Sequence, residues 1–137
     1  MATKSNKKLG NDFENRFCLR LFDAGFWVHR LNQNAAGQPA DLIAVRNKRG
    51  FLIDCKVCTG NGFRLNRVEE NQDLSMGLWK ERGNGNGWFA IELSNGDIYM
   101  LMHDDIKDYR EEVKVLKEET IREECIGLKE WLNIYAR

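Results

Sequence analysis

The sequence predicts an α/β protein in which helices flank a central mixed sheet of five strands. Apolar residues recur at helical spacing in some segments, whereas others are short apolar runs bounded by Gly, Asn and Pro. The two kinds of segment alternate along the chain, which favours a layered structure over separate all-helical and all-strand parts. At 137 residues, with 42% hydrophobic and 31% charged residues, the chain is typical of one globular domain.

The first half is expected to form one helix and three strands. Phe13, Phe17 and Leu21 recur at helical spacing and Gly25 supplies a stop, so residues 10–25 are predicted to be helical. A strand (26–31), a polar loop (32–38) and a hairpin (39–57) follow.

The second half is expected to form a helix, a hairpin and further helices. Residues 67–82 have a helical pattern, with Asn66 as the expected N-cap and Glu69 completing a capping box. An Asn-Gly turn at residues 94–97 lies between two apolar runs, which is a strong hairpin signal. Helices are expected at 104–112 and 118–133.

The net charge is zero but unevenly distributed. Residues 1–68 carry 12 Lys/Arg and 5 Asp/Glu, whereas residues 69–137 carry 9 and 16. The basic half suggests a surface that faces a polyanion, although chance scatter over a solvated surface gives the same counts. The sequence has no apolar run of about 18 residues and no secretory signal, so we expect a cytoplasmic protein with reduced cysteines.

The stretch PADLIAVRNKRGFLIDCKV, residues 39–57, places charges inside apolar strands. With a four-residue turn at residues 47–50, Asp41 falls opposite Lys56, and alternation puts Asp54 on the same face. Two carboxylates and one ammonium then meet at one end of a sheet face, with Cβ atoms about 5–8 Å apart.

This group of charges suits a metal-dependent phosphodiesterase. Two close carboxylates repel each other unless a cation or a proton intervenes, and Mg²⁺ binds one or two carboxylates together with waters and phosphate oxygens. A neighbouring lysine stabilises charge on a phosphate or orients an attacking water. A structural salt bridge at the end of a sheet fits the same spacing.

The motif resembles the PD-(D/E)xK nuclease superfamily, and within it the Holliday junction resolvases of the Hjc and RecU type. The similarity spans residues 10–102. Its elements are GNDFE (10–14), GFWVHR (25–30), PAD (39–41), DCK (54–56) and ENQ (70–72). It implies a restriction-endonuclease-like fold. It also implies a Mg²⁺-dependent endonuclease, with Mn²⁺ as a substitute, that acts as a homodimer on four-way or other branched DNA.

The resemblance also implies roles for individual residues. Asp41, Asp54 and the Cys55 carbonyl would bind the metal, and Glu14 would complete the shell. Lys56 would activate the attacking water, and Gln72 would orient Lys56 or the phosphate. Glu14 also has the spacing of a capping box with Asn11, and Gln72 could equally make a buried structural hydrogen bond.

Basic residues on the arm and in loops are the candidate DNA contacts, because such groups neutralise the phosphate backbone. They are Lys7, Lys8, Lys48, Arg49, Arg64 and Arg67. Each alone is also compatible with an ordinary surface charge. Cys55 and Cys58 have the spacing of half a zinc site, but no second pair is present to complete it.

We therefore expect residues 1–137 to form one nuclease domain, with a flexible basic arm (1–9) and a helical C-terminal extension (104–137). The favoured function is resolution of DNA junctions. The alternatives are a repair or nicking nuclease of the same fold and a non-catalytic DNA-binding module.

Overall fold

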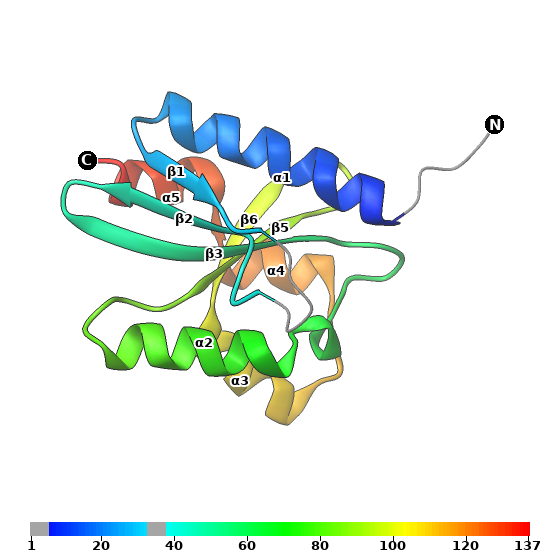
Figure 1. Ribbon diagram of the computed structural model, residues 1–137. Helices are drawn as coiled ribbons and strands as arrows, with labels where there is room; N and C mark the ends of the chain where they lie inside the picture. The colour runs from blue at the N-terminus through cyan, green and yellow to red at the C-terminus, as the bar shows by residue number, and fades with distance from the viewer. Residues whose placement is uncertain (1–5, 33–37) are drawn as a thin grey trace.

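The computed structural model describes residues 6–32 and 38–137, and its centre is a mixed sheet of six strands (Figure 1). The strands lie in the order β1-β2-β3-β5-β6-β8, where β3 and β5 are parallel and the other neighbours antiparallel. Their bounds are β1 Trp27–Arg30, β2 Leu42–Arg46, β3 Arg49–Val57, β5 Trp88–Glu92, β6 Ile98–Met102 and β8 Ile126–Gly127. A separate pair joins β4 (Phe63–Arg64) to β7 (Val115–Leu116).

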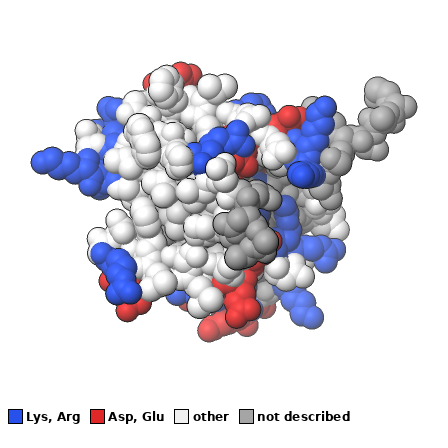
Figure 2. Space-filling view, viewed as in Figure 1, with Lys and Arg blue, Asp and Glu red and all other residues white. Residues whose placement is uncertain are grey.

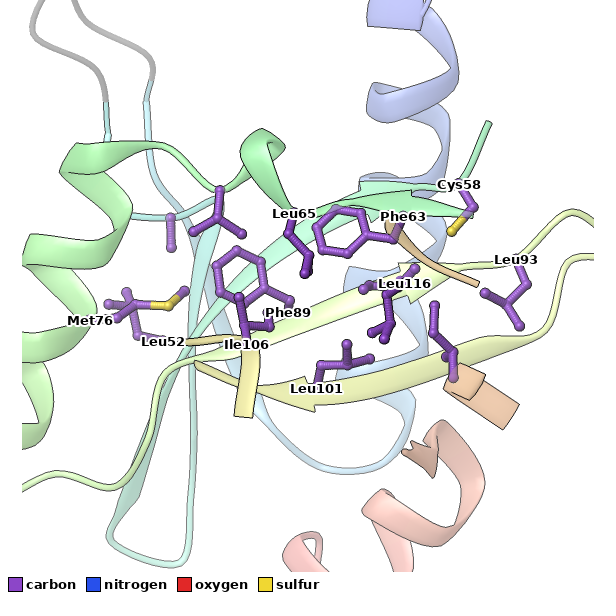
Figure 3. Packing of buried hydrophobic residues seen from close by; sticks show 14 residues of the cluster. Leu52, Cys58, Phe63, Leu65, Met76, Phe89, Leu93, Leu101, Ile106 and Leu116 are labelled. Carbon is purple, nitrogen blue, oxygen red and sulfur yellow. The ribbon is translucent and has the colours of Figure 1, made fainter. Parts of the chain in front are cut away.

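Helices cover both faces of the sheet (Figure 1). They are α1 Asn6–Asp23, α2 Glu70–Glu81, α3 His103–Glu112, α4 Glu118–Glu124 and α5 Leu128–Tyr135, with a 3-10 turn at Leu65–Arg67. Phe13 and Phe17 of α1 pack with Trp131 of α5 in one hydrophobic cluster. Met76 of α2 and Ile106 of α3 belong to a second cluster on the opposite face (Figure 3). The predicted α/β architecture is confirmed.

The hairpin of β2 and β3 closes with a shorter turn than the sequence suggested. Arg46 pairs with Arg49, so the turn has two residues. Asn47 and Lys48 both have positive φ, 51° and 67°, as in the type I′ turns whose twist matches that of antiparallel strands. The register is shifted by two residues from the expected one, which keeps every side chain on its predicted face.

Helix α1 begins earlier than expected. It starts at Asn6, so residues 6–9 of the expected arm are helical, and residues 1–5 lie outside the described part of the chain. Asn11 lies inside the helix, so the capping box with Glu14, which was the alternative to its role in the active site, is not formed. The four preceding residues extend the helix, which places Glu14 in its third turn.

Helix α2, in contrast, begins later than predicted. It starts at Glu70, and its capping box joins Glu69 to Gln72 instead of Asn66 to Glu69. Residues 65–67 form a 3-10 turn, which takes the chain from β4 into α2. The hairpin around residues 94–97 is confirmed by the pairing of β5 with β6.

The C-terminal part is more interrupted than a single helix over 118–133. Cys125 has extended backbone angles and ends α4, and β8 then adds a sixth strand beside β6. Helix α5 follows, and its Trp131 is fully buried against Phe26 and Phe51, with ring centroids 5.9 and 5.2 Å away. The division into one domain with a C-terminal extension stays a prediction.

Candidate active site

Asp41 and Asp54 meet at the end of β2 and β3 that lies away from the turn. Leu42 pairs with Ile53, and the Asp41 N–H donates to the Ile53 carbonyl at 3.1 Å. Continuing this register brings Asp41 opposite Asp54, rather than opposite Lys56 as the longer turn would have required. The two carboxylates therefore lie closer together than predicted.

The carboxylate of Asp41 extends the hydrogen-bond ladder beyond the end of β2. Its Oδ2 accepts the backbone N–H of Cys55 at 2.7 Å, and its Oδ1 accepts the side-chain amide of Gln38 at 2.9 Å. These two bonds fix the plane of the carboxylate. Asp41 thus has a structural contact within the sheet besides its place in the charged group.

Asp54 is a buried carboxylate that its surroundings do not neutralise. It is 2% exposed, and its Oδ2 lies 3.1 Å from Lys56 Nζ. Within the described residues this oxygen accepts no hydrogen bond of good geometry. Burial and the nearby Asp41 carboxylate raise the pKa of Asp54 to about 8, which Lys56 only partly opposes. A carboxylate in this position requires a proton or a cation.

Glu14 approaches the same end of the sheet from α1. Its carboxylate accepts from the guanidinium of Arg30 at 2.8 and 2.9 Å. Burial and the neighbouring Asp41 raise the pKa of Glu14, while Arg30 lowers it. Glu14 is therefore close enough to Asp41 to interact with it electrostatically, but Arg30 holds its carboxylate.

Gln72 is buried in the first turn of α2. Its Oε1 accepts the backbone N–H of Glu69 at 3.1 Å, which makes it the N3 residue of the capping box. The buried structural hydrogen bond that the sequence offered as an alternative role for Gln72 is thus present. Its donor is the backbone N–H of Glu69 at the N-terminus of α2. A contact between Gln72 and Lys56 stays a prediction.

The residues fit a divalent cation at Asp41 and Asp54. No three His, Cys, Asp or Glu side chains in residues 6–32 and 38–137 form a ready-made metal group. Two facing carboxylates, one with a buried oxygen that accepts no hydrogen bond, are nevertheless the donor set that Mg²⁺ takes with waters and phosphate oxygens. Cation binding would also remove the repulsion that raises the pKa of Asp54.

The candidate DNA contacts fall into separate places. Lys7 at the start of α1 lines a cavity of about 710 Å³ together with Glu14, Arg30 and Gln38, and Lys8 is exposed beside it. Arg64 is exposed on β4. Lys48 and Arg49 lie at the hairpin turn, about 17–20 Å along the strand from Asp54 at the usual rise per residue.

Arg67 has a structural role that sequence reasoning did not foresee. Its guanidinium donates to the Val57 carbonyl at 2.6 Å and lies over the ring of Phe63. These contacts join the segment before α2 to the end of β3. A phosphate contact for Arg67 would have to share the guanidinium with this carbonyl.

Sequence reasoning missed two further side chains at the site. Gln38 donates to Asp41, and Asn71 donates to the Gln38 carbonyl at 2.8 Å. Asn71 and Gln38 are 33 positions apart in the chain, so no local pattern indicated the contact. The position of Gln38 three residues before Asp41 was the only available signal.

The side chains of the cysteine pair and of the histidines are not part of the site as described, although the Cys55 backbone N–H donates to Asp41. Cys55 packs with the cluster beneath α1, whereas Cys58 belongs to the opposite cluster, and all four cysteines are free. His29 stacks on Trp27. His103 is buried and lies 2.7 Å from Asp73.

The fold is restriction-endonuclease-like, and the family that the chain matches is one of metal-dependent endonucleases. The sequence model of the archaeal Holliday junction resolvase family, Hjc, matches residues 5–137. The chain belongs to this family, and its function is resolution of Holliday junctions.

A solved structure supports the fold. The Hjc resolvase of Archaeoglobus fulgidus is similar with a TM-score of 0.68 at 16% identity, over 90% of this chain and 99% of that one. No curated protein matches the chain. Among the described helices, none is long and apolar enough to cross a membrane.

Proposed function

We propose that the protein cuts four-way DNA junctions as a homodimer, with Mg²⁺ held by Asp41, Asp54 and the Cys55 carbonyl. The observation that carries this proposal is the buried Asp54 carboxylate, which faces Asp41 and has an elevated pKa. A fold without a ligand at this point would gain stability by replacing Asp54 with an apolar residue. The bound cation would polarise the scissile phosphate and lower the pKa of a water.

The other site residues would position the phosphate and the attacking water or remove a proton from that water. Lys56, with Nζ 3.1 Å from Asp54, would hold and help deprotonate the attacking water. Glu14 would exchange its contact with Arg30 for the shell of the cation, and the released guanidinium would face the phosphate. Gln72 would support Lys56 or the phosphate from the N-terminus of α2. Mn²⁺ would substitute for Mg²⁺, since both accept oxygen donors.

A homodimer is expected because resolution requires two symmetric cuts. Helix α2 exposes Leu74 and Leu78, 65% and 49% exposed and one turn apart, and Trp27 on β1 is 61% exposed. Figure 2 shows a broad area without charged residues between α1 and α2, over the first strands of the sheet. We propose that a second copy covers this area. Because α2 begins beside the charged group, pairing through α2 would bring two active sites toward one junction.

The same family supports expectations for the DNA contacts and for the cellular location. Lys7 and Lys8 at the start of α1 would contact the strand that is cut, while Arg64, Lys48 and Arg49 would contact other parts of the DNA backbone. Arg67 is a weaker candidate for a phosphate contact, because its guanidinium already donates to the Val57 carbonyl. A DNA substrate and four free thiols support a cytoplasmic location.

Cleavage of a substrate panel tests the proposal. Purified protein is incubated with four-way junction, flap, duplex and single-stranded DNA in Mg²⁺, Mn²⁺ or EDTA. We expect paired symmetric cuts in the junction, with either metal, and none in EDTA. Preferential cutting of flaps would favour the repair-nuclease alternative, and junction binding without cutting under all conditions would favour the binding module.

Sedimentation tests the dimer. Leu78→Glu should convert a dimer into a monomer and abolish paired cuts. Ile134→Glu is a matched control, because Ile134 is 46% exposed on α5, outside the proposed interface. A wild-type monomer at micromolar concentration, or equal effects of the two variants, would contradict the proposed interface.

A further inference from the structure

The side-chain amide of Gln38 turns its nitrogen toward Asp41. The nitrogen Nε2 donates to Asp41 Oδ1 at 2.9 Å. A carboxylate accepts hydrogen bonds and donates none when ionised. The orientation of the amide is therefore fixed by Asp41, with nitrogen toward the carboxylate and oxygen away from it.

The amide oxygen of Gln38 is buried and accepts no hydrogen bond from the part of the chain that the structure describes. Among residues 6–32 and 38–137, no group donates a hydrogen bond to Oε1, although the atom is shielded from solvent. An unsatisfied buried oxygen costs about 1–3 kcal/mol, and such atoms in native proteins commonly mark an ion or a water. The oxygen belongs to the same amide that touches Asp41, so a cation bound by Asp41 would lie close to it.

The backbone of Gln38 is held in place from the opposite side. Asn71 in the first turn of α2 donates its side-chain amide to the Gln38 carbonyl at 2.8 Å. The first turn of α2 also contains Gln72, which is fixed by the capping box. Gln38 is thus fixed at its main chain by α2 and at its side chain by Asp41, so its free oxygen has a defined position.

We propose that Gln38 is a further member of the cation site. Its Nε2 orients the Asp41 carboxylate, and its Oε1 is an uncharged oxygen donor to the divalent cation, directly or through one coordinated water. Asn71 is a positioning residue that acts through the Gln38 main chain. The inference rests on the proposed role of Asp41 and Asp54 as metal ligands.

An uncharged donor suits this position for an electrostatic reason. Asp41 and Asp54 face each other at the end of β2 and β3, and two carboxylates so close repel each other when no cation is bound. A third carboxylate would add to the repulsion whenever the cation is absent. An amide contributes an oxygen without that charge, and its nitrogen orients the Asp41 carboxylate through the hydrogen bond to Oδ1.

Binding of Mn²⁺ to the protein without DNA tests the inference. Affinity is measured by electron paramagnetic resonance or calorimetry at pH 8. Gln38→Met keeps the length of the side chain and removes both polar atoms, and it should weaken Mn²⁺ binding about tenfold, as loss of outer-shell partners usually does. Gln38→Glu retains an oxygen, so it should bind Mn²⁺ at least as tightly as the wild type while the metal-free protein melts at a lower temperature.

Asn71→Ala tests the positioning role, and Asn133→Ala is its matched control. Asn133 is an exposed amide on α5. Asn71→Ala should lower Mn²⁺ affinity by less than Gln38→Met and should lower kcat more than it raises KM for junction DNA. Asn133→Ala should match the wild type in both measurements.

The outcomes separate this inference from the proposed function. A wild-type protein that binds no Mn²⁺ would refute the proposed metal site itself. Wild-type Mn²⁺ binding that is unchanged in Gln38→Met would overturn the role of Gln38 alone. If Gln38→Met fails to fold, weaker Mn²⁺ binding by Gln38→Glu overturns the role and retained binding supports it.

Discussion

The two ends of strand β3 differ in how completely their side chains are satisfied. Near the turn, Phe51 packs against the rings of Trp131 and Tyr135, with centroids 5.2 and 5.4 Å away. Near the other end, Asp54 is about as buried as Trp131 but faces a second carboxylate. One half of the strand therefore stabilises the fold by packing, whereas the other half carries a charge that destabilises the fold until a cation or a proton arrives.

The difference teaches that burial alone does not identify a residue's role. Burial of aromatic rings contributes favourable transfer free energy, whereas burial of an unneutralised carboxylate costs free energy. The packing of the apolar part of β3 therefore offsets the cost of burying the Asp54 carboxylate. Substitutions at the two ends should consequently have opposite effects on stability and activity.

The largest expected effect is on cleavage by Asp54→Asn. This change keeps the size of the side chain and removes one charge from the proposed cation site, so Mg²⁺-dependent junction cleavage should fall by several orders of magnitude. Chemical denaturation in EDTA at pH 8 should show equal or higher stability. DNA binding, measured by gel shift, should persist because the surface cations are unchanged.

A companion variant separates the roles at the polar end. Lys56→Ala should also abolish cleavage but retain Mn²⁺ binding. Near wild-type cleavage by Asp54→Asn, or inactivity explained by its unfolding, would sink the assignment.

The opposite result is expected at the aromatic end. Trp131→Ala removes a fully buried ring and should lower the free energy of unfolding by about 3–5 kcal/mol. The fraction that remains folded, quantified by circular dichroism, should cut junctions at close to the wild-type rate. A large loss of activity per folded molecule would show that this end takes part in catalysis.

The pH dependence of stability gives a smaller, more specific signal. Because the pKa of Asp54 is raised in the folded state to about 8, the metal-free folded protein binds more protons than the unfolded chain between about pH 4 and pH 8. The contribution of Asp54 to the free energy of unfolding is therefore most favourable at low pH. It is lost as the pH rises through the pKa of Asp54 in the folded state.

Comparison with Asp54→Asn isolates this contribution. In EDTA, the stability of the wild type relative to Asp54→Asn should fall by a few kcal/mol between pH 5 and pH 8. Mg²⁺ at pH 8 should restore part of this loss in the wild type only. Parallel pH profiles for the two proteins would contradict the elevated pKa.

The smallest effect on activity is expected for the cysteine pair. Cys55 and Cys58 pack against opposite clusters, so Cys55→Ser with Cys58→Ser should leave cleavage and metal content nearly unchanged while costing some stability by burying hydroxyls. Stoichiometric zinc that is lost in the double variant would refute this expectation.

The sequence by itself determined which residues share a face. Strand alternation placed Asp41, Asp54 and Lys56 together, and the assignment survived a wrong turn because the register error was two residues, an even number. Helical spacing likewise identified Phe13, Phe17 and Leu21 as core residues, and they are fully buried. These features depend on local periodicity, which the chain carries in its own order of residues.

Only the tertiary structure decided which charges face each other and what holds them. The two-residue turn put Asp41 opposite Asp54, the earlier start of α1 removed Glu14 from a helix cap, and α2 brought Asn71 to Gln38. The break at Cys125 added a sixth strand, which no helical pattern indicated. The contact of Asn71 with Gln38 and the pairing of β8 with β6 join residues far apart in the chain, and local propensity does not contain their energies.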